Sequence, residues 1–121
     1  MDANLRLNEV QLVGTAESYK LRPSAGILAL VHMGGGAKDA QALDFAQPPL
    51  AAQLDHDARS LQFDIAYDPQ GGLFKSPAGA SMAMDLVDPA YQAAMTQPGF
   101  KVIQVLDVDD NASCVTLDDC P

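Results

Sequence analysis

The chain has no tryptophan, few other aromatic residues and few basic residues, and these shortages exclude several classes of protein. Seven Lys and Arg residues against sixteen Asp and Glu residues give a net charge of −9. This disfavours nucleic acid and anionic membranes as partners, because both require basic side chains to neutralise phosphate. No apolar run approaches the roughly 18–20 residues of a transmembrane helix, and the first residues lack the basic and apolar regions of a secretory signal. A cation, a basic protein or a neutral ligand stays possible, as does acidity that serves solubility alone.

The length and the apolar content of 48% predict a single domain over residues 1–121. Nine glycines and eight prolines imply many turns. Cys114 and Cys120 are close enough in sequence to close a small disulfide loop, which we expect, with two free thiols as the alternative. A zinc site is disfavoured because no histidine lies between or beside these cysteines.

Alternating or continuous apolar residues predict three strands, at 7–13, 60–68 and 100–108. Helices are predicted at 48–59 and 88–95, a strand or a short helix at 25–36, a loop at 73–80, and the start of a helix in 109–121 with Asn111 or Ser113 as its N-cap. Strands that alternate with helical segments indicate an α/β protein with about three parallel strands.

Three blocks of the sequence resemble a known family. They are "LNEVQLVGTAESYKLRPS", "PPLAAQLDHDARSLQFDIAYDPQGGLF" and "PGFKVIQVLDVDDNASCVTLDDC". In this order they are similar to the Gly-Thr-His-Asn-Ser-Tyr loop and the two following strand blocks of secreted calcium-dependent phosphatidylinositol-specific phospholipases C, which belong to the phospholipase C-like phosphodiesterase superfamily. The resemblance implies a TIM-type barrel with its site at the C-terminal ends of the strands, two catalytic histidines, a bound Ca²⁺ and secretion.

Matched position by position, the resemblance points to five residues. The first family histidine falls on Ala16, the neighbouring calcium-ligand asparagine on Glu17, the Glu-x-Asp pair on Gln62 and Asp64, and the second histidine on Gln104. Neither alanine nor glutamine can transfer a proton near neutral pH, so we expect the acid–base chemistry to be lost. The oxygens of Glu17, Gln62 and Asp64 are the candidates for a weak residual Ca²⁺ site or a ligand site.

A few charged residues outside these positions are also candidates. Arg59 is the phosphate candidate of this region, although a pair with Asp55, one helical turn earlier, is the preferred interpretation. Lys20 and Arg22 are weaker phosphate candidates. The spacing Asp107-x-Asp109-x-Asn111 matches the start of an EF-hand loop, but a solvated acidic cap is the preferred interpretation.

Three functional hypotheses follow. The leading one is a catalytically inactive phospholipase C-like homologue that acts in binding or assembly, with a small polar or phosphate-containing ligand. The second is an active phosphodiesterase with a residual metal site, and the third is an acidic interaction or inhibitor module. A barrel needs roughly 200–250 residues, so we expect a partial barrel, completed in a longer chain, by a second copy or by a partner chain, or else a different small α/β fold.

Overall fold

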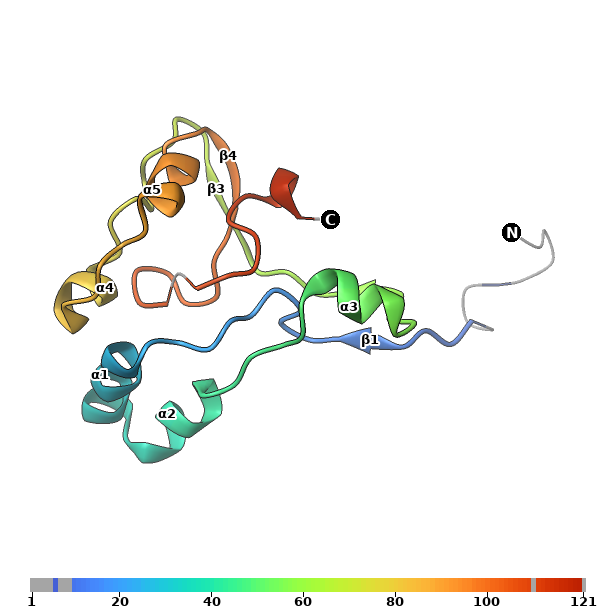
Figure 1. Ribbon diagram of the computed structural model, residues 1–121, viewed down its shortest axis with the longest axis horizontal. Coiled ribbons are helices and arrows are strands. Elements are labelled where there is room, and N and C mark those ends of the chain that lie inside the picture. The colour runs from blue at the N-terminus through green and yellow to red at the C-terminus, as the bar shows by residue number, and fades with distance from the viewer. Residues whose placement is uncertain (1–5, 7–9, 110, 121) are drawn as a thin grey trace.

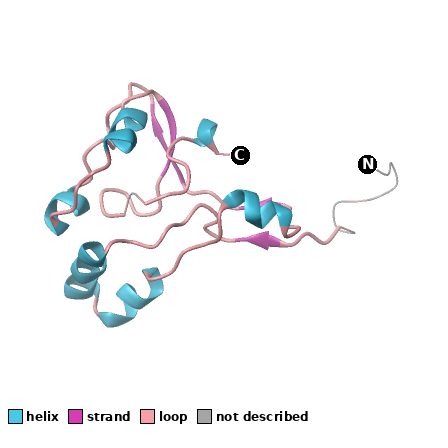
Figure 2. Ribbon diagram, in the orientation of Figure 1, coloured by secondary structure: helices cyan, strands magenta, loops and turns pink. Residues whose placement is uncertain are grey.

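The structure is a computed structural model that describes residues 6, 10–109 and 111–120. Its strands are β1 (Gly14–Thr15), β2 (Ser60–Leu61), β3 (Ile65–Asp68) and β4 (Gly99–Val102). Its helices are α1 (Ala25–Gly35), α2 (Ala37–Leu43), α3 (Leu50–Asp55), α4 (Ala78–Ala83), α5 (Pro89–Met95) and a short 3₁₀ helix (Leu117–Asp119). Long loops connect short elements, with α1 and α2 side by side and α5 beside the β3–β4 pair (Figures 1 and 2).

The described strands form two separate two-stranded sheets. β1 and β2 are parallel, with Gly14 opposite Ser60, whereas β3 and β4 are antiparallel, with Ile65 opposite Val102. The mixed helix and strand content agrees with the expected α/β class. The expected set of about three parallel strands is wrong for these residues, because the second and third predicted strands meet in opposite directions and no barrel arrangement is seen in the described part of the chain.

The strands are also shorter than predicted. In the first predicted strand, residues 7–9 lie outside the described residues, and 10–13 form no strand. Val13 is 68% exposed, so this segment has no core to pack against, although its carbonyl accepts a hydrogen bond from the Arg59 amide at 2.8 Å. The predicted strand 60–68 is two strands, because the chain leaves β1 after Leu61 and pairs with β4 from Ile65 onward.

The third predicted strand, 100–108, is β4 and ends at Val102. Asp107 has a φ of 64°, a left-handed conformation that an extended strand does not allow. The backbone amides of Val108 and Asp109 instead donate to the carbonyl of Val105 in a tight turn. The apolar run therefore turns back on itself after its first residues.

The helices agree better with the sequence. Residues 25–36, which fitted either a strand or a helix, form α1: the Ser24 hydroxyl accepts from the Ile27 amide at 3.0 Å, and Gly36 ends the helix with a φ of 93°. The predicted helix 88–95 is α5, with Asp88 as its N-cap, and the predicted helix 48–59 shortens to α3.

Two further helices lie in segments without a predicted helix. α2 follows α1 directly, and α4 occupies the end of the predicted loop 73–80. Both are rich in alanine, the best helix former. Gly79 lets α4 approach the backbone of Val108, since a Cβ at this glycine would lie 2.3 Å from the Val108 carbonyl oxygen.

Two small clusters make up the core. One joins the first loop to α3, β4 and the tail; its buried members are Tyr19, Leu50, Val102 and Cys114. The other lies between α5 and the β3–β4 pair; its buried members are Tyr91, Met95 and Ile103.

The tail is held by a disulfide rather than by a helix. Cys114 and Cys120 are bonded, with their Cα atoms 5.3 Å apart. The predicted helix with Asn111 or Ser113 as its N-cap is wrong, because among the described residues from 111 to 120 only the three of the 3₁₀ helix are helical. Inside the disulfide loop, the Val115 carbonyl accepts from the Val102 amide at 3.0 Å, so the loop covers the edge of β4.

Candidate functional site

The loop after β1 is tied to the chain that follows β2. The Ser18 amide donates to the Gln62 carbonyl at 3.0 Å, and the Gln62 amide donates to the Ser18 hydroxyl at 2.8 Å. The buried side chain of Gln53, from α3, accepts from the Thr15 hydroxyl at 2.5 Å and donates to the Ser18 carbonyl at 2.7 Å. Sequence reasoning identified neither Ser18 nor Gln53, because a buried glutamine on a helix has no distinctive spacing.

A chain of polar contacts connects the loop to the segment that follows β4. The amide nitrogen of Gln104 donates to Glu17 Oε2 at 2.7 Å, and its amide oxygen accepts from Lys20 Nζ at 2.5 Å. Lys20 also forms an ion pair with Asp109, at 3.6 Å, and both side chains are fully buried. Two residues that the family resemblance singles out, 87 positions apart, are therefore in direct contact.

The interpretation of Asp109 as part of a solvated acidic cap is wrong. Its side chain is fully buried against Lys20, and it has no exposed surface for water. A buried charge is costly unless it is paired, so each of these two residues requires the other. The acidic run around position 109 gave no sign of this burial.

Tyr19 connects the same loop to Asp64. The fully buried phenol donates to Asp64 Oδ2 at 2.9 Å, and its ring stacks on Phe63 with the centroids 5.8 Å apart. Burial raises the pKa of Tyr19 well above its usual value, and the hydrogen bond to Asp64 and the negative charges of Asp64 and Glu17 raise it further. The phenol is therefore a neutral hydrogen-bond donor at physiological pH.

The other singled-out residues lie at the border of this region. Ala16 and Gln62 are exposed, while Glu17, Asp64 and Gln104 are half-buried. Glu17 has a φ of 48°, a left-handed conformation that is uncommon for a residue with a side chain.

The basic side chains predicted as phosphate candidates have other partners. Arg59 lies before β2, whereas Gln62 and Asp64 follow that strand. The Arg59 guanidinium contacts Asp57 at 2.9 Å, so the expected pair with Asp55 is wrong. Arg22 pairs with Asp44 at 2.9 Å. Lys20, the third candidate, is buried in the network described above.

The donor set of this region does not fit a calcium ion. Ca²⁺ takes about 6–8 oxygen ligands, yet Glu17 Oε2 and Asp64 Oδ2 already accept hydrogen bonds from Gln104 and Tyr19. The Gln104 oxygen lies 2.5 Å from the Lys20 ammonium, whose charge repels a cation. Within the described residues, three or more His, Cys, Asp or Glu side chains nowhere gather as a potential metal site.

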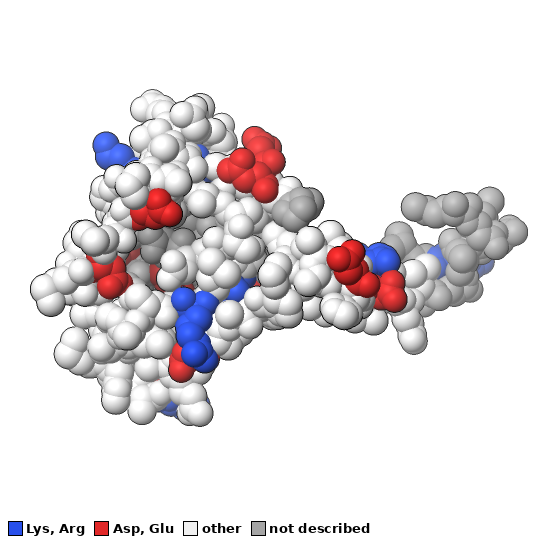
Figure 3. Space-filling model, in the orientation of Figure 1, with Lys and Arg blue, Asp and Glu red and all other residues white. Residues whose placement is uncertain are grey.

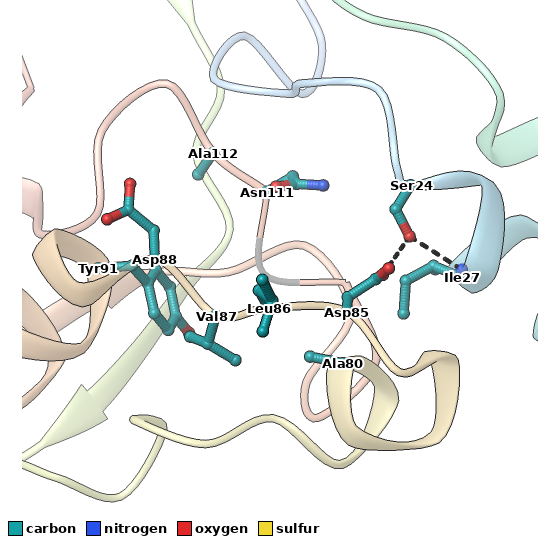
Figure 4. A pocket seen from close by; sticks show the side chains of 10 residues that line it. All are labelled: Ser24, Ile27, Ala80, Asp85, Leu86, Val87, Asp88, Tyr91, Asn111 and Ala112. Atoms are coloured by element: carbon teal, nitrogen blue, oxygen red, sulfur yellow. Dashed lines mark hydrogen bonds between the residues drawn. The ribbon is translucent and has the colours of Figure 1, made fainter.

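A cavity of about 350 Å³ lies between the start of α1, the end of α4, the start of α5 and residues 111–112 (Figure 4). In it the Ser24 hydroxyl lies between the Asp85 carboxylate, to which it donates, and the Ile27 amide (Figure 4). The cavity contains none of the residues that the resemblance singles out.

A family model described as phosphoinositide phospholipase C, Ca²⁺-dependent, matches residues 5–121. The protein is thus phospholipase C-like over nearly its whole length, and it belongs to this calcium-dependent phosphoinositide phospholipase C family. No curated protein and no solved structure matches the chain. None of the helices in the described segments is long and apolar enough to cross a membrane.

Proposed function

We propose that this protein is a non-catalytic member of its family that retains the site region for binding. The observation that carries the proposal is the pair of hydrogen bonds made by the Gln104 side chain. Its amide oxygen accepts from Lys20, and its amide nitrogen donates to Glu17. By the sequence resemblance, Gln104 falls at the position of the family's second histidine and Ala16 at that of the first. Each proton-transfer group contributes about 10²–10⁴ in rate, so losing both removes most of the catalysis.

The polar groups that remain accessible favour a neutral, hydroxyl-rich ligand. Gln62 is exposed, and the carboxylates of Glu17 and Asp64 are half-exposed, so this border offers mainly hydrogen-bond acceptors to a ligand. The cation of this region, Lys20, is fully buried, and Arg59 is engaged by Asp57. A phosphate group would therefore meet two carboxylates without an accessible basic side chain from this set. We infer that a polyol suits the site better than a phosphate ester, and that the chain binds no Ca²⁺ there.

Assembly is the second part of the proposal. Ile65, Tyr67 and Phe100 lie on one face of the β3–β4 pair and are 49%, 61% and 47% exposed, with the two rings 4.9 Å apart. Exposed apolar residues that adjoin one another favour contact with another chain. The acidic side chains, by contrast, lie in separate groups on the face that Figure 3 shows, which gives less support to a continuous acidic docking surface.

The test is an assay with phosphatidylinositol and with a generic phosphodiester, each with calcium and with a chelator. We expect no turnover above the blank, together with chemical-shift changes at Gln62 when myo-inositol is added. Turnover that Asp64→Ala abolishes would overturn the proposal, because contaminating activity would not respond to this variant. Light scattering on the same sample tests assembly separately from ligand binding. A compact monomer would refute assembly and leave ligand binding as the proposed role.

A further inference from the structure

The interior holds two lysines whose side chains are completely inaccessible, Lys20 and Lys101. Lys101 Nζ donates to the backbone carbonyls of Ala94 and Gln97, at 3.1 and 2.5 Å, at the end of α5. Such carbonyls carry the negative end of the helix dipole, so this ammonium stabilises a helix terminus. Lys101 is a structural lysine, since both carbonyls that accept its hydrogen bonds lie outside the site region.

Lys20 has different surroundings. Its ammonium donates to the Gln104 side chain at 2.5 Å, pairs with Asp109 at 3.6 Å and lies 4.9 Å from the centre of the Phe45 ring. An amide oxygen, a carboxylate and an aromatic face are all favourable partners for a cation. Through Gln104 the contact continues to Glu17, so one buried positive charge arranges residues from the first loop and from the segment after β4.

We propose that the Lys20 ammonium is the internal cation of this site, which holds Gln104 and, through it, Glu17 in place where the donor set does not fit a calcium ion. A metal ion would have to displace the ammonium from the Gln104 oxygen, or accept its repulsion at close range. It would also compete with Gln104 for Glu17 Oε2. The lysine is covalently part of the chain, so the site is arranged at any calcium concentration.

This inference shares the Lys20–Gln104–Glu17 contacts with the proposed function, but it does not depend on the loss of proton transfer. An internal cation could organise an active site equally well, since the proposal makes no use of Ala16. Turnover in the phosphodiesterase assay would therefore refute the proposed function and leave the role of Lys20 standing. A calcium response of the wild-type protein would refute the role of Lys20 and the inference that the site binds no Ca²⁺, and it would leave the proposed loss of catalysis standing.

The experiment compares the wild type with Lys20→Met and with the matched control Lys101→Met, which also removes a buried ammonium. The melting temperature of each protein is measured with calcium and with a chelator. We expect no calcium effect on the wild type or on Lys101→Met. In Lys20→Met the oxygens of Gln104, Glu17 and Asp109 lose their cation, so calcium at about ten times its dissociation constant raises the melting temperature by about 5 °C. A folded Lys20→Met protein with no greater calcium response than Lys101→Met would overturn the proposal.

Lys20→Met leaves Asp109 as a buried carboxylate without its ion-pair partner and can fail to fold. If this variant does not fold, measurements on the wild-type protein test the proposal. Nitrogen-15 spectra should show the Lys20 ammonium protected from exchange with water, and the Gln104 side-chain amide signals should not move when calcium is added. Calorimetric binding of calcium by the wild type, together with displaced Gln104 signals, would show that a metal ion and not Lys20 is the cation of the site.

Discussion

Replacing Tyr19 by phenylalanine isolates one hydrogen bond of the site. The ring stays in place, stacked on Phe63 and fully buried, so the apolar packing of the first core cluster is retained. What disappears is the hydroxyl, which donates to Asp64 Oδ2 at 2.9 Å. The substitution therefore measures how strongly the first loop is attached to the segment between β2 and β3.

The expected cost follows from the burial of the two partners. A hydrogen bond to a charged group contributes about 1.5–3 kcal/mol to stability. Asp64 is only half-buried, so water compensates for part of the loss at its carboxylate. We expect Tyr19→Phe to lower the free energy of unfolding by about 1–2 kcal/mol at neutral pH.

The pH dependence gives a second, independent signature. The pKa of Tyr19 is raised by burial, by its hydrogen bond to Asp64 and by the nearby negative charges. A raised pKa means that the folded state holds the proton more tightly than the unfolded state, whose tyrosines titrate near about 10. The contribution of the hydroxyl is therefore complete below that pH and is lost as the pH rises above it. The stability difference between the wild type and Tyr19→Phe should shrink in the alkaline range.

Urea denaturation followed by circular dichroism measures both effects, at neutral pH and at a series of alkaline values. Tyr67→Phe is the matched control, because Tyr67 is 61% exposed. The reasoning is refuted if Tyr19→Phe costs no more than this control. It is equally refuted if the difference from the wild type does not change through the alkaline range.

Two further substitutions test the turns and the tail. Gly71→Ala should destabilise the fold more than Gly72→Ala. Both glycines have a positive φ, which costs about 1–2 kcal/mol for alanine. A Cβ at Gly71 would in addition lie 2.1 Å from the Thr96 carbonyl oxygen. Equal urea midpoints for the two variants would contradict the clash. Replacing Cys114 and Cys120 together by serine should cost about 2 kcal/mol through loop-closure entropy; an unchanged unfolding free energy would show that the disulfide does not restrain the unfolded chain.

Local signals in the sequence predicted the helices better than the strands. Asp88 followed by proline marks the start of α5, and Gly36 marks the end of α1, because caps act within a few residues. Alternation along 60–68 correctly indicated extended chain, but alternation does not specify a partner strand. The switch from a parallel to an antiparallel partner between Leu61 and Ile65 is decided by tertiary contacts and leaves no periodic trace.

The candidate site likewise has residues that the sequence indicated and contacts that only the fold reveals. Linear similarity singled out Glu17 and Gln104, which the fold places in direct contact. The sequence offered Lys20 only as a weak phosphate candidate and Asp109 only as part of an acidic cap or an EF-hand-like spacing. Lysine and aspartate are usually exposed, and nothing in their positions indicates a mutual buried pair. Those two residues connect the first loop to the segment after β4, and this connection is a property of the fold rather than of any motif.

The two buried ammonium groups have a practical consequence for studies of this protein. An amine-reactive reagent can reach Lys38 and Lys75, which are exposed, but has no access to Lys20 or Lys101 while the chain is folded. Mass spectrometry of the labelled protein can therefore report opening of the first loop and of the end of α5 separately, at native positions and without an attached probe.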